Sequence, residues 1–295
     1  MRLSTVILPI YEWAEGRGVW RRAEELGFDT GYTYDHLTWQ SFRDRPWFAA
    51  VPTLSAAATA TEHMRIGTLV ASPNFRHPVQ LAKELMTLDH LSGGRLTAGI
   101  GSGGTGFDAT ALGQEPWSPG DRAERLDEFV ALLDELLTHS STTVRGRHYS
   151  AVEARTVPAC VQRPRVPFLV AAAGRRGLRL AAEFGQGWVT YGDPQGGFDA
   201  TPESAYEAVR AQTVRLESAC DDAGRAYGSI DKVLLQGLTS ERPLDSVGAF
   251  VEWAGRYREL GIDEVVVHWP VPDSVFATDP RVFERIATEG RSQLS

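Results

Sequence analysis

The residues best suited to chemistry in this sequence follow a short apolar run. Asp35 and His36 come directly after residues 28–34, which favour a strand. An imidazole gains or loses a proton near neutral pH, so a histidine at the end of a strand can act as a general acid or base. The alternative is a surface histidine beside an aspartate that caps a helix. The same letters at Asp89 and His90 lie on an expected helix face, where we expect a structural role.

Two turns rich in small residues offer room for a flat or phosphorylated ligand, although an ordinary tight turn is the alternative in both places. The run Gly99-Ile100-Gly101-Ser102-Gly103-Gly104 matches the letters of a nicotinamide-binding GxGxxG loop. That loop requires a helix to begin within the turn, and we expect no helix before Asp121. Glycines at a strand end still let a planar ring approach the backbone. In Ala172-Ala173-Gly174-Arg175-Arg176, free amides at a helix start and two arginines favour a phosphate.

Other catalytic chemistries have little support in the sequence. The chain of 295 residues contains no GxSxG, HExxH or P-loop motif. Its two cysteines, Cys160 and Cys220, lie far apart, so we expect reduced thiols, no metal site and a cytoplasmic location. The net charge of −8 argues against nucleic acid or an anionic membrane as a partner. No apolar stretch approaches the roughly 20 residues of a membrane span.

The elements that must position these residues alternate between strands and helices. The clearest unit is Met64 to Gly104, in which Pro78 favours a helix start and Gly93 a helix end. Strands that are apolar throughout are typical of a parallel sheet buried on both faces. Eight such strands predict an α/β fold, a (β/α)8 TIM barrel with insertions in the loops at the strand carboxyl ends. The expected strands are 3–9, 28–34, 64–70, 95–101, 166–171, 187–191, 232–238 and 264–269.

Residues that follow the strands of a barrel share one face, where barrel enzymes carry their chemistry. Here that face is aromatic, rich in glycine and poor in carboxylates, which fits a flat aromatic ligand better than a metal. The expected lining of a substrate pocket is Tyr11, Trp39, Tyr191 and Trp269. The segments 103–120 and 192–203 are the expected lids. Residues 144–149 are expected to form a short strand or hairpin outside the barrel, and residues 1–295 a single domain.

Taken together, these motifs resemble the bacterial luciferase-like flavin family, and within it the branch that uses the deazaflavin F420. The resemblance rests on GFDTGYTYDH at 27–36, RIGTLVASPNFRHPVQLAKELMTLDHLSGGRLTAGIGSG at 65–103 and RAERLDEFVALLDELL at 122–137. It also rests on RGRHY at 145–149 and VPFLVAAAGRRGLRLAAEFGQGW at 166–188. It covers the first two thirds of the chain and weakens after them. It implies a (β/α)8 barrel that holds a flavin-like ring at the strand carboxyl ends.

The resemblance also implies roles for individual residues. His36 would be the catalytic acid or base, and the peptide bond between Leu69 and Val70 would be cis. Ser72 would hydrogen-bond the cofactor, and the turn at 172–175 would hold its phosphate. The cofactor-binding residues expected on this basis are Asp35, Leu69, Val70, Ala71, Ser72, Gly101, Ser102, Gly103, Ala172, Ala173, Gly174 and Arg175.

Two departures argue against a sugar-phosphate substrate. The sugar-phosphate dehydrogenases of this family carry a glutamate after the glycines of the fourth strand, where this chain has Gly103-Gly104-Thr105. Their phosphate-binding lysines have no counterpart, since Lys83 and Lys232 are the only lysines in the sequence.

The favoured hypothesis is an F420-dependent oxidoreductase that transfers a hydride between C5 of the deazaflavin and an organic substrate. With reduced F420, the expected reaction is the reduction of a C=C or C=N bond. One alternative is an FMN-dependent monooxygenase that uses reduced flavin and dioxygen. Another is a flavin-binding relative without turnover. The expected substrate is a small apolar or peptide-like molecule, and a homodimer is what the resemblance implies.

Overall fold

Residues 1–104, 106–193, 200–237 and 239–294 are described by a computed structural model. Within them, eight parallel strands close into a barrel in the order β1, β10, β9, β8, β7, β4, β3, β2. The predicted barrel is therefore confirmed. Its strands are β1 (Arg2–Val6), β2 (Thr30–Thr33), β3 (Arg65–Ala71), β4 (Leu96–Gly101), β7 (Phe168–Ala171), β8 (Gly187–Thr190), β9 (Asp231–Leu235) and β10 (Glu264–His268).

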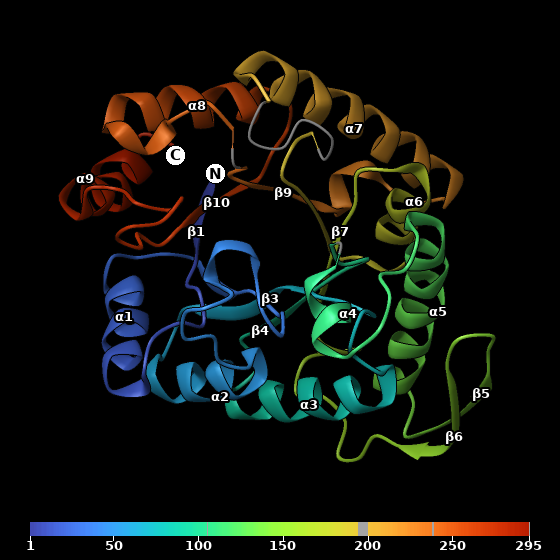
Figure 1. The fold of residues 1–295 in the computed structure, drawn as a ribbon. Helices are drawn as coiled ribbons and strands as arrows, with labels where there is room; N and C mark the ends of the chain where they lie inside the picture. The colour runs from blue at the N-terminus through green and yellow to red at the C-terminus, as the bar shows by residue number, and fades with distance from the viewer. Residues whose placement is uncertain (105, 194–199, 238, 295) are drawn as a thin grey trace.

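Helices surround the barrel on its outer side (Figure 1). Two of them begin where the sequence supplies a capping hydroxyl and an early proline, as at Ser118, whose Oγ accepts a hydrogen bond from the Asp121 N–H at 3.1 Å. The main helices are α1 (Trp13–Glu25), α2 (Ala50–Ala60), α3 (Pro78–Leu91), α5 (Pro119–Thr138), α6 (Arg175–Phe184), α7 (Pro202–Asp222), α8 (Val247–Glu259) and α9 (Pro280–Arg285).

The apolar side chains fill two regions, one on each side of the strands. Leu81, Leu85 and Leu88 of α3 are fully buried between this helix and the barrel, as their helical spacing predicts. Val233 and Val266 belong to a separate cluster inside the barrel. This packing on both faces makes the strands a rigid support for the residues at their carboxyl ends.

Two segments outside the eight repeats differ in how well they were predicted. Residues 144–149 lie in a hairpin of β5 (Ser141–Arg145) and β6 (Ser150–Arg155), so the predicted hairpin is confirmed. The prediction that no helix begins before Asp121 is wrong, because α4 spans Phe107–Ala111 and α5 begins at Pro119. A five-residue helix leaves too little periodic pattern to recognise. Of the expected lid at 192–203, residues 194–199 lie outside the described residues, as does residue 105 of the other lid.

Candidate active site

Four neighbouring strands bring the predicted site residues to one rim of the barrel. β2, β3, β4 and β7 are adjacent and parallel, so their carboxyl ends meet. These ends lead to His36, Ser72, Gly101 and Ala172. The predicted catalytic histidine and the three predicted cofactor-binding turns therefore lie at the same end of the barrel, where such folds bind their ligands.

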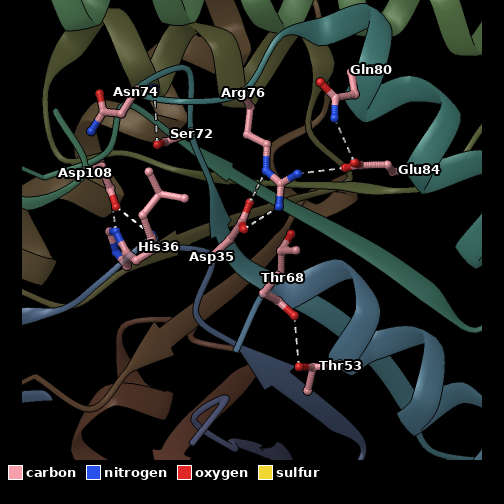
Figure 2. Close-up of polar contacts among 12 residues, drawn as sticks. Asp35, His36, Thr53, Thr68, Ser72, Asn74, Arg76, Gln80, Glu84 and Asp108 are labelled. Carbon is pink, nitrogen blue, oxygen red and sulfur yellow. Dashed lines mark hydrogen bonds and ion pairs between the residues drawn. The ribbon is translucent and has the colours of Figure 1, made fainter. Parts of the chain in front are cut away.

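His36 is held by an aspartate that comes from α4. The Nδ1 atom of His36 lies 2.8 Å from Oδ2 of Asp108, and Oδ1 of Asp108 accepts a hydrogen bond from the Leu37 N–H at 2.7 Å (Figure 2). A carboxylate at Nδ1 keeps the ring proton on that nitrogen. Nε2 has no hydrogen-bond partner among the described residues, so it is the ring nitrogen available to a ligand.

The Asp35 carboxylate forms a buried ion pair with Arg76. Nε and Nη2 of Arg76 donate to its two carboxylate oxygens at 3.0 and 2.7 Å, and Nη1 of Arg76 lies 2.8 Å from Glu84 (Figure 2). Asp35 is 1% exposed. Because both carboxylate oxygens are used inside the protein, the side chain of Asp35 supports the loop after β3 and is not positioned as a direct cofactor ligand.

β3 has an irregular carboxyl end. The peptide bond between Leu69 and Val70 is cis, and the register of β3 on β4 shifts between Thr68 and Ala71. A Cβ atom on Gly101 would lie only 2.7 Å from Cγ2 of Val70, so the valine side chain packs directly on this glycine. Gly101 is buried and Val70 is partly exposed above it, so the valine side chain presents an apolar surface at this rim.

The loops after β3 and β4 are joined beside this surface. Oγ of Ser72 accepts a hydrogen bond from the Asn74 N–H at 3.4 Å, and the Asn74 side chain donates to the carbonyl of Gly104 at 3.1 Å. Gly103 has φ +71°, and a Cβ there would lie 2.8 Å from Oγ of Ser72. Glycine is therefore required at 103 both by the backbone conformation and by the close approach of the serine.

The turn after β7 leads directly into α6. Gly174 is the N-cap residue of this helix, with no side-chain cap, and apart from its chain neighbours no described residue has an atom within 4 Å of a Cβ built on it. The carbonyl of Ala172 accepts a hydrogen bond from the indole N–H of Trp188 at 2.8 Å, which fixes the turn to β8. The first amides of α6 are thus free and open, an arrangement that favours an anion such as a phosphate. Arg175 is exposed at the same helix start.

An aromatic cluster stands beside His36. The ring of Tyr34 meets the rings of His36 and His268 edge-on, at centroid distances of 6.2 and 5.7 Å. Trp39 lies 5.5 Å from Tyr34, and Phe276 stacks on both His268 and Trp39, at 4.0 and 5.6 Å. We call these five residues the aromatic wall. It contains Trp39, one of the predicted pocket residues.

The sequence profile of luciferase-like monooxygenases matches residues 4–225. The chain belongs to the luciferase-like monooxygenase family. An F420-dependent glucose-6-phosphate dehydrogenase of Beutenbergia cavernae is 38% identical over 178 residues, which cover 57% of this chain and 49% of that protein. The match therefore spans about half the length of that relative. A protein of the same name from Amycolatopsis mediterranei is 29% identical over 277 residues, which cover 88% of this chain and 79% of that protein.

Solved structures show that the luciferase-like fold extends over the whole chain. The coenzyme F420 dependent tetrahydromethanopterin reductase from Methanopyrus kandleri superimposes with a TM-score of 0.77 at 16% identity, covering 100% of this chain and 99% of that one. At this identity the likeness concerns the fold alone. Among the described residues, no helix is long and apolar enough to cross a membrane, and no cluster of three or more His, Cys, Asp or Glu could hold a metal.

Two of the predicted pocket residues lie elsewhere in this luciferase-like barrel. The ring of Trp269 packs against Phe28 and Phe283, at centroid distances of 6.4 and 5.3 Å, in the layer between barrel and helices. Tyr11 lines a separate, mostly apolar cavity of about 290 Å³ beside α1 and α2. Neither side chain joins the aromatic wall, so neither lies beside Trp39 in this cluster.

Sequence reasoning missed a buried polar pair in the aromatic wall. Oη of Tyr34 lies 2.7 Å from Nε2 of His268. Burial raises the pKa of Tyr34, with a smaller contribution from nearby Tyr191, and burial lowers the pKa of His268 to about 3. The phenol therefore stays protonated and donates to a neutral imidazole. Tyr191, a predicted pocket residue, is 51% exposed.

The buried His268 should make the protein sensitive to acid. Its pKa is about 3 in the folded chain against an ordinary value of 6.5, so the unfolded chain takes up the proton first as the pH falls. The stability that the neutral ring contributes is complete above pH 6.5 and is lost towards pH 3, by about 2 kcal/mol between pH 7 and pH 5. His268→Phe should remove this loss. Urea unfolding of both proteins at the two pH values checks it, and equal pH dependence in both would contradict it.

Proposed function

We propose that this chain is an F420-dependent oxidoreductase that transfers a hydride between C5 of the deazaflavin and an organic substrate. One observation carries the proposal: the apolar surface that Val70 forms over Gly101 lies at the same rim as a histidine whose Nδ1 is held by Asp108. The names of the Beutenbergia and Amycolatopsis relatives support F420 as the cofactor. The lack of an acid at Gly103-Gly104 favours a substrate other than a sugar phosphate.

The residues present fit a flat cofactor that carries a phosphate. A Cβ at Gly101 would lie 2.7 Å from Val70 and 3.1 Å from Ala171, so only glycine leaves room for Val70 at the position where it would support a ring. Leu69, Val70 and Ser72 would border that ring. The uncapped start of α6 at Gly174 would hold the phosphate through backbone N–H groups.

The deazaflavin supplies the hydride chemistry when it is bound. His36 would donate or accept the coupled proton at Nε2, the nitrogen without a partner among the described residues. Asp108 would keep the ring oriented and would stabilise the imidazolium when both nitrogens carry protons. The other residues of the aromatic wall would exclude water around His36 and accommodate an apolar substrate. In the proposed direction, a C=C or C=N bond gains a hydride at one atom and the proton of His36 at the other.

The test is an anaerobic assay with reduced F420 and a panel of electron-poor alkenes and imines. The proposal predicts that the cofactor is oxidised only when an acceptor with a C=C or C=N bond is present, and that one reduced product forms per cofactor. A product that forms only with FMN and dioxygen, with oxygen consumed in step, would instead favour the monooxygenase.

Gly174→Ala tests phosphate binding by the start of α6 without a large effect on folding. Its Cβ would meet no atom of the other described residues within 4 Å, its chain neighbours aside, and its φ of −96° suits alanine, so the free energy of unfolding should fall by no more than about 1 kcal/mol. The same methyl group would obstruct the approach of a phosphate to the backbone, so F420 should bind about tenfold more weakly or worse. Fluorescence titration measures the affinity. The control is Gly248→Ala in the first turn of α8, and equal affinity in both variants would contradict the assignment.

A further inference from the structure

A cavity of about 260 Å³ lies beside the aromatic wall, at the carboxyl ends of β9 and β10. His268 and Phe276 of the wall contribute to its lining, and the rest comes from the segments that follow these two strands. In the closed order of the barrel, β9 and β10 stand opposite β3 and β4, whose ends carry Val70 and Gly101. The cavity therefore lies across the barrel mouth from the proposed cofactor surface, on the side left for a substrate.

The charged side chains of this lining carry no excess of positive charge. They belong to Glu241, Arg242 and Asp245, and Glu241 is paired at 3.1 Å with Arg256 from α8. Arg242 and Asp245 are both exposed. An organic anion would thus meet two carboxylates and a single exposed arginine, whereas a neutral polar group would meet no such repulsion.

His268 presents a neutral hydrogen-bond donor to this cavity. Its Nε2 accepts from the phenol of Tyr34 at 2.7 Å, so the proton of the uncharged ring is on Nδ1. Nδ1 has no hydrogen-bond partner among the described residues. His268 is 4% exposed, and its Nδ1 is not one of the fully enclosed side-chain atoms that lack a partner. The accessible part of the ring therefore includes the Nδ1–H group.

The ring of His268 is held in place before any ligand binds. Phe276 stacks on it at a centroid distance of 4.0 Å, and Tyr34 meets it edge-on at 5.7 Å. A donor fixed in this way loses little side-chain entropy when it binds an acceptor. Because burial lowers the pKa of His268 to about 3, the ring stays neutral near neutral pH. Its Nδ1–H can therefore bind an acceptor, while proton transfer is left to His36.

We propose that this cavity is a substrate subsite for the neutral carbonyl group of an amide or a ketone. The carbonyl oxygen accepts a hydrogen bond from Nδ1–H of His268. Tyr34 is the positioning residue that keeps the proton on this nitrogen. As a part of the substrate pocket, the subsite rests on the proposed function. A carboxylate is disfavoured there by Glu241 and Asp245.

The first test is calorimetric titration of the full chain, without cofactor, with benzamide as the probe. The subsite predicts saturable binding of benzamide. Benzoate and ethylbenzene, which replace the amide with a charged group and with a group that accepts no hydrogen bond, should bind about fivefold more weakly or worse. NMR of protein with isotope-labelled histidines should show the proton of His268 on Nδ1, and a shift of this Nδ1–H signal when benzamide is added.

His268→Phe keeps an aromatic ring beside Phe276 but removes the donor. Its affinity for benzamide should fall about fivefold or more, whereas its affinity for ethylbenzene should not fall. The matched control is His63→Phe, since the side chain of His63 is 89% exposed, and it should bind benzamide like the wild type.

Tyr34→Phe covers the case in which His268→Phe does not fold. It removes only the phenol oxygen, so the proton of His268 is no longer confined to Nδ1. The NMR spectrum should then show the proton shared between both ring nitrogens, a change that a purely structural role of Tyr34 would not produce. Benzamide should bind more weakly as a result.

The subsite is overturned if the wild type does not bind benzamide saturably, if benzoate or ethylbenzene binds equally well, or if the proton of His268 is on Nε2. A separate titration with F420 distinguishes this failure from that of the proposed function. Benzamide binding as predicted in a chain that does not bind F420 would overturn the proposed function alone. F420 binding without benzamide binding would overturn the subsite alone.

Discussion

Replacing His36 with alanine is expected to lower turnover about 100-fold or more, because positioned acid–base catalysis typically contributes 10²–10⁴-fold. The dissociation constant of F420 should change by less than about threefold, since the surface of Val70 and Gly101 and the start of α6 are untouched. Single-turnover kinetics and a fluorescence titration, made on the same preparation, measure the two quantities.

One control variant and one variant of the partner of His36 make this result specific. His63→Ala is the control, because the side chain of His63 is 89% exposed and lies far from the rim that carries His36. Asp108→Asn should also lower turnover, by a smaller factor, because the amide no longer orients the ring and stabilises its protonated form as the carboxylate does. Wild-type turnover in His36→Ala would remove this residue from the mechanism.

Replacing Arg76 with methionine is expected to destabilise the protein by about 3–5 kcal/mol, the cost of leaving a buried charge without its partner. Asp35 is 1% exposed and receives two hydrogen bonds from Arg76, and no other ion pair to Asp35 is present among the described residues. Urea unfolding at pH 7 measures the change. Arg281→Met, which removes an exposed arginine, should change the free energy of unfolding by less than about 0.5 kcal/mol.

The double variant Asp35→Leu/Arg76→Met decides whether the loss comes from the unpaired charge. Removing both partners eliminates the buried charge, so the double variant should be more stable than Arg76→Met alone, by about 1–3 kcal/mol. If the double variant is less stable than either single variant, the contacts of Arg76 with its surroundings matter more than its pairing with Asp35.

The fold was predictable because its signals are local and repeated. The apolar runs that became strands and the spacing of Leu81, Leu85 and Leu88 depend only on nearby residues. The start of α6 after Gly174 was predictable for the same reason. The partners of the site residues were not predictable, because each partner lies far in sequence from the residue that it contacts. Asp108 is 72 positions from His36 and Arg76 is 41 positions from Asp35, and no pattern in a single sequence relates such pairs.

Side-chain direction explains why Trp269 does not join the aromatic wall. His268 and Trp269 are adjacent at the end of β10, and successive side chains of a strand point to opposite faces. His268 therefore joins Tyr34 at the barrel mouth, while Trp269 packs against Phe28 and Phe283 outside the barrel. The sequence identified an aromatic strand end correctly, but only the register of the strand shows which of the two residues faces the site.

The measurement that tests the account most directly is a fluorescence titration of the purified chain with F420 and, separately, with FMN, repeated on Gly101→Val. The account predicts tight binding of F420 and weak binding of FMN. It also predicts that Gly101→Val loses F420 affinity, because its side chain would displace Val70, whose Cγ2 lies 2.7 Å from the Cβ position. Tight binding of FMN without F420, or F420 binding unaffected by Gly101→Val, would contradict the central claim that this rim holds a deazaflavin for hydride transfer.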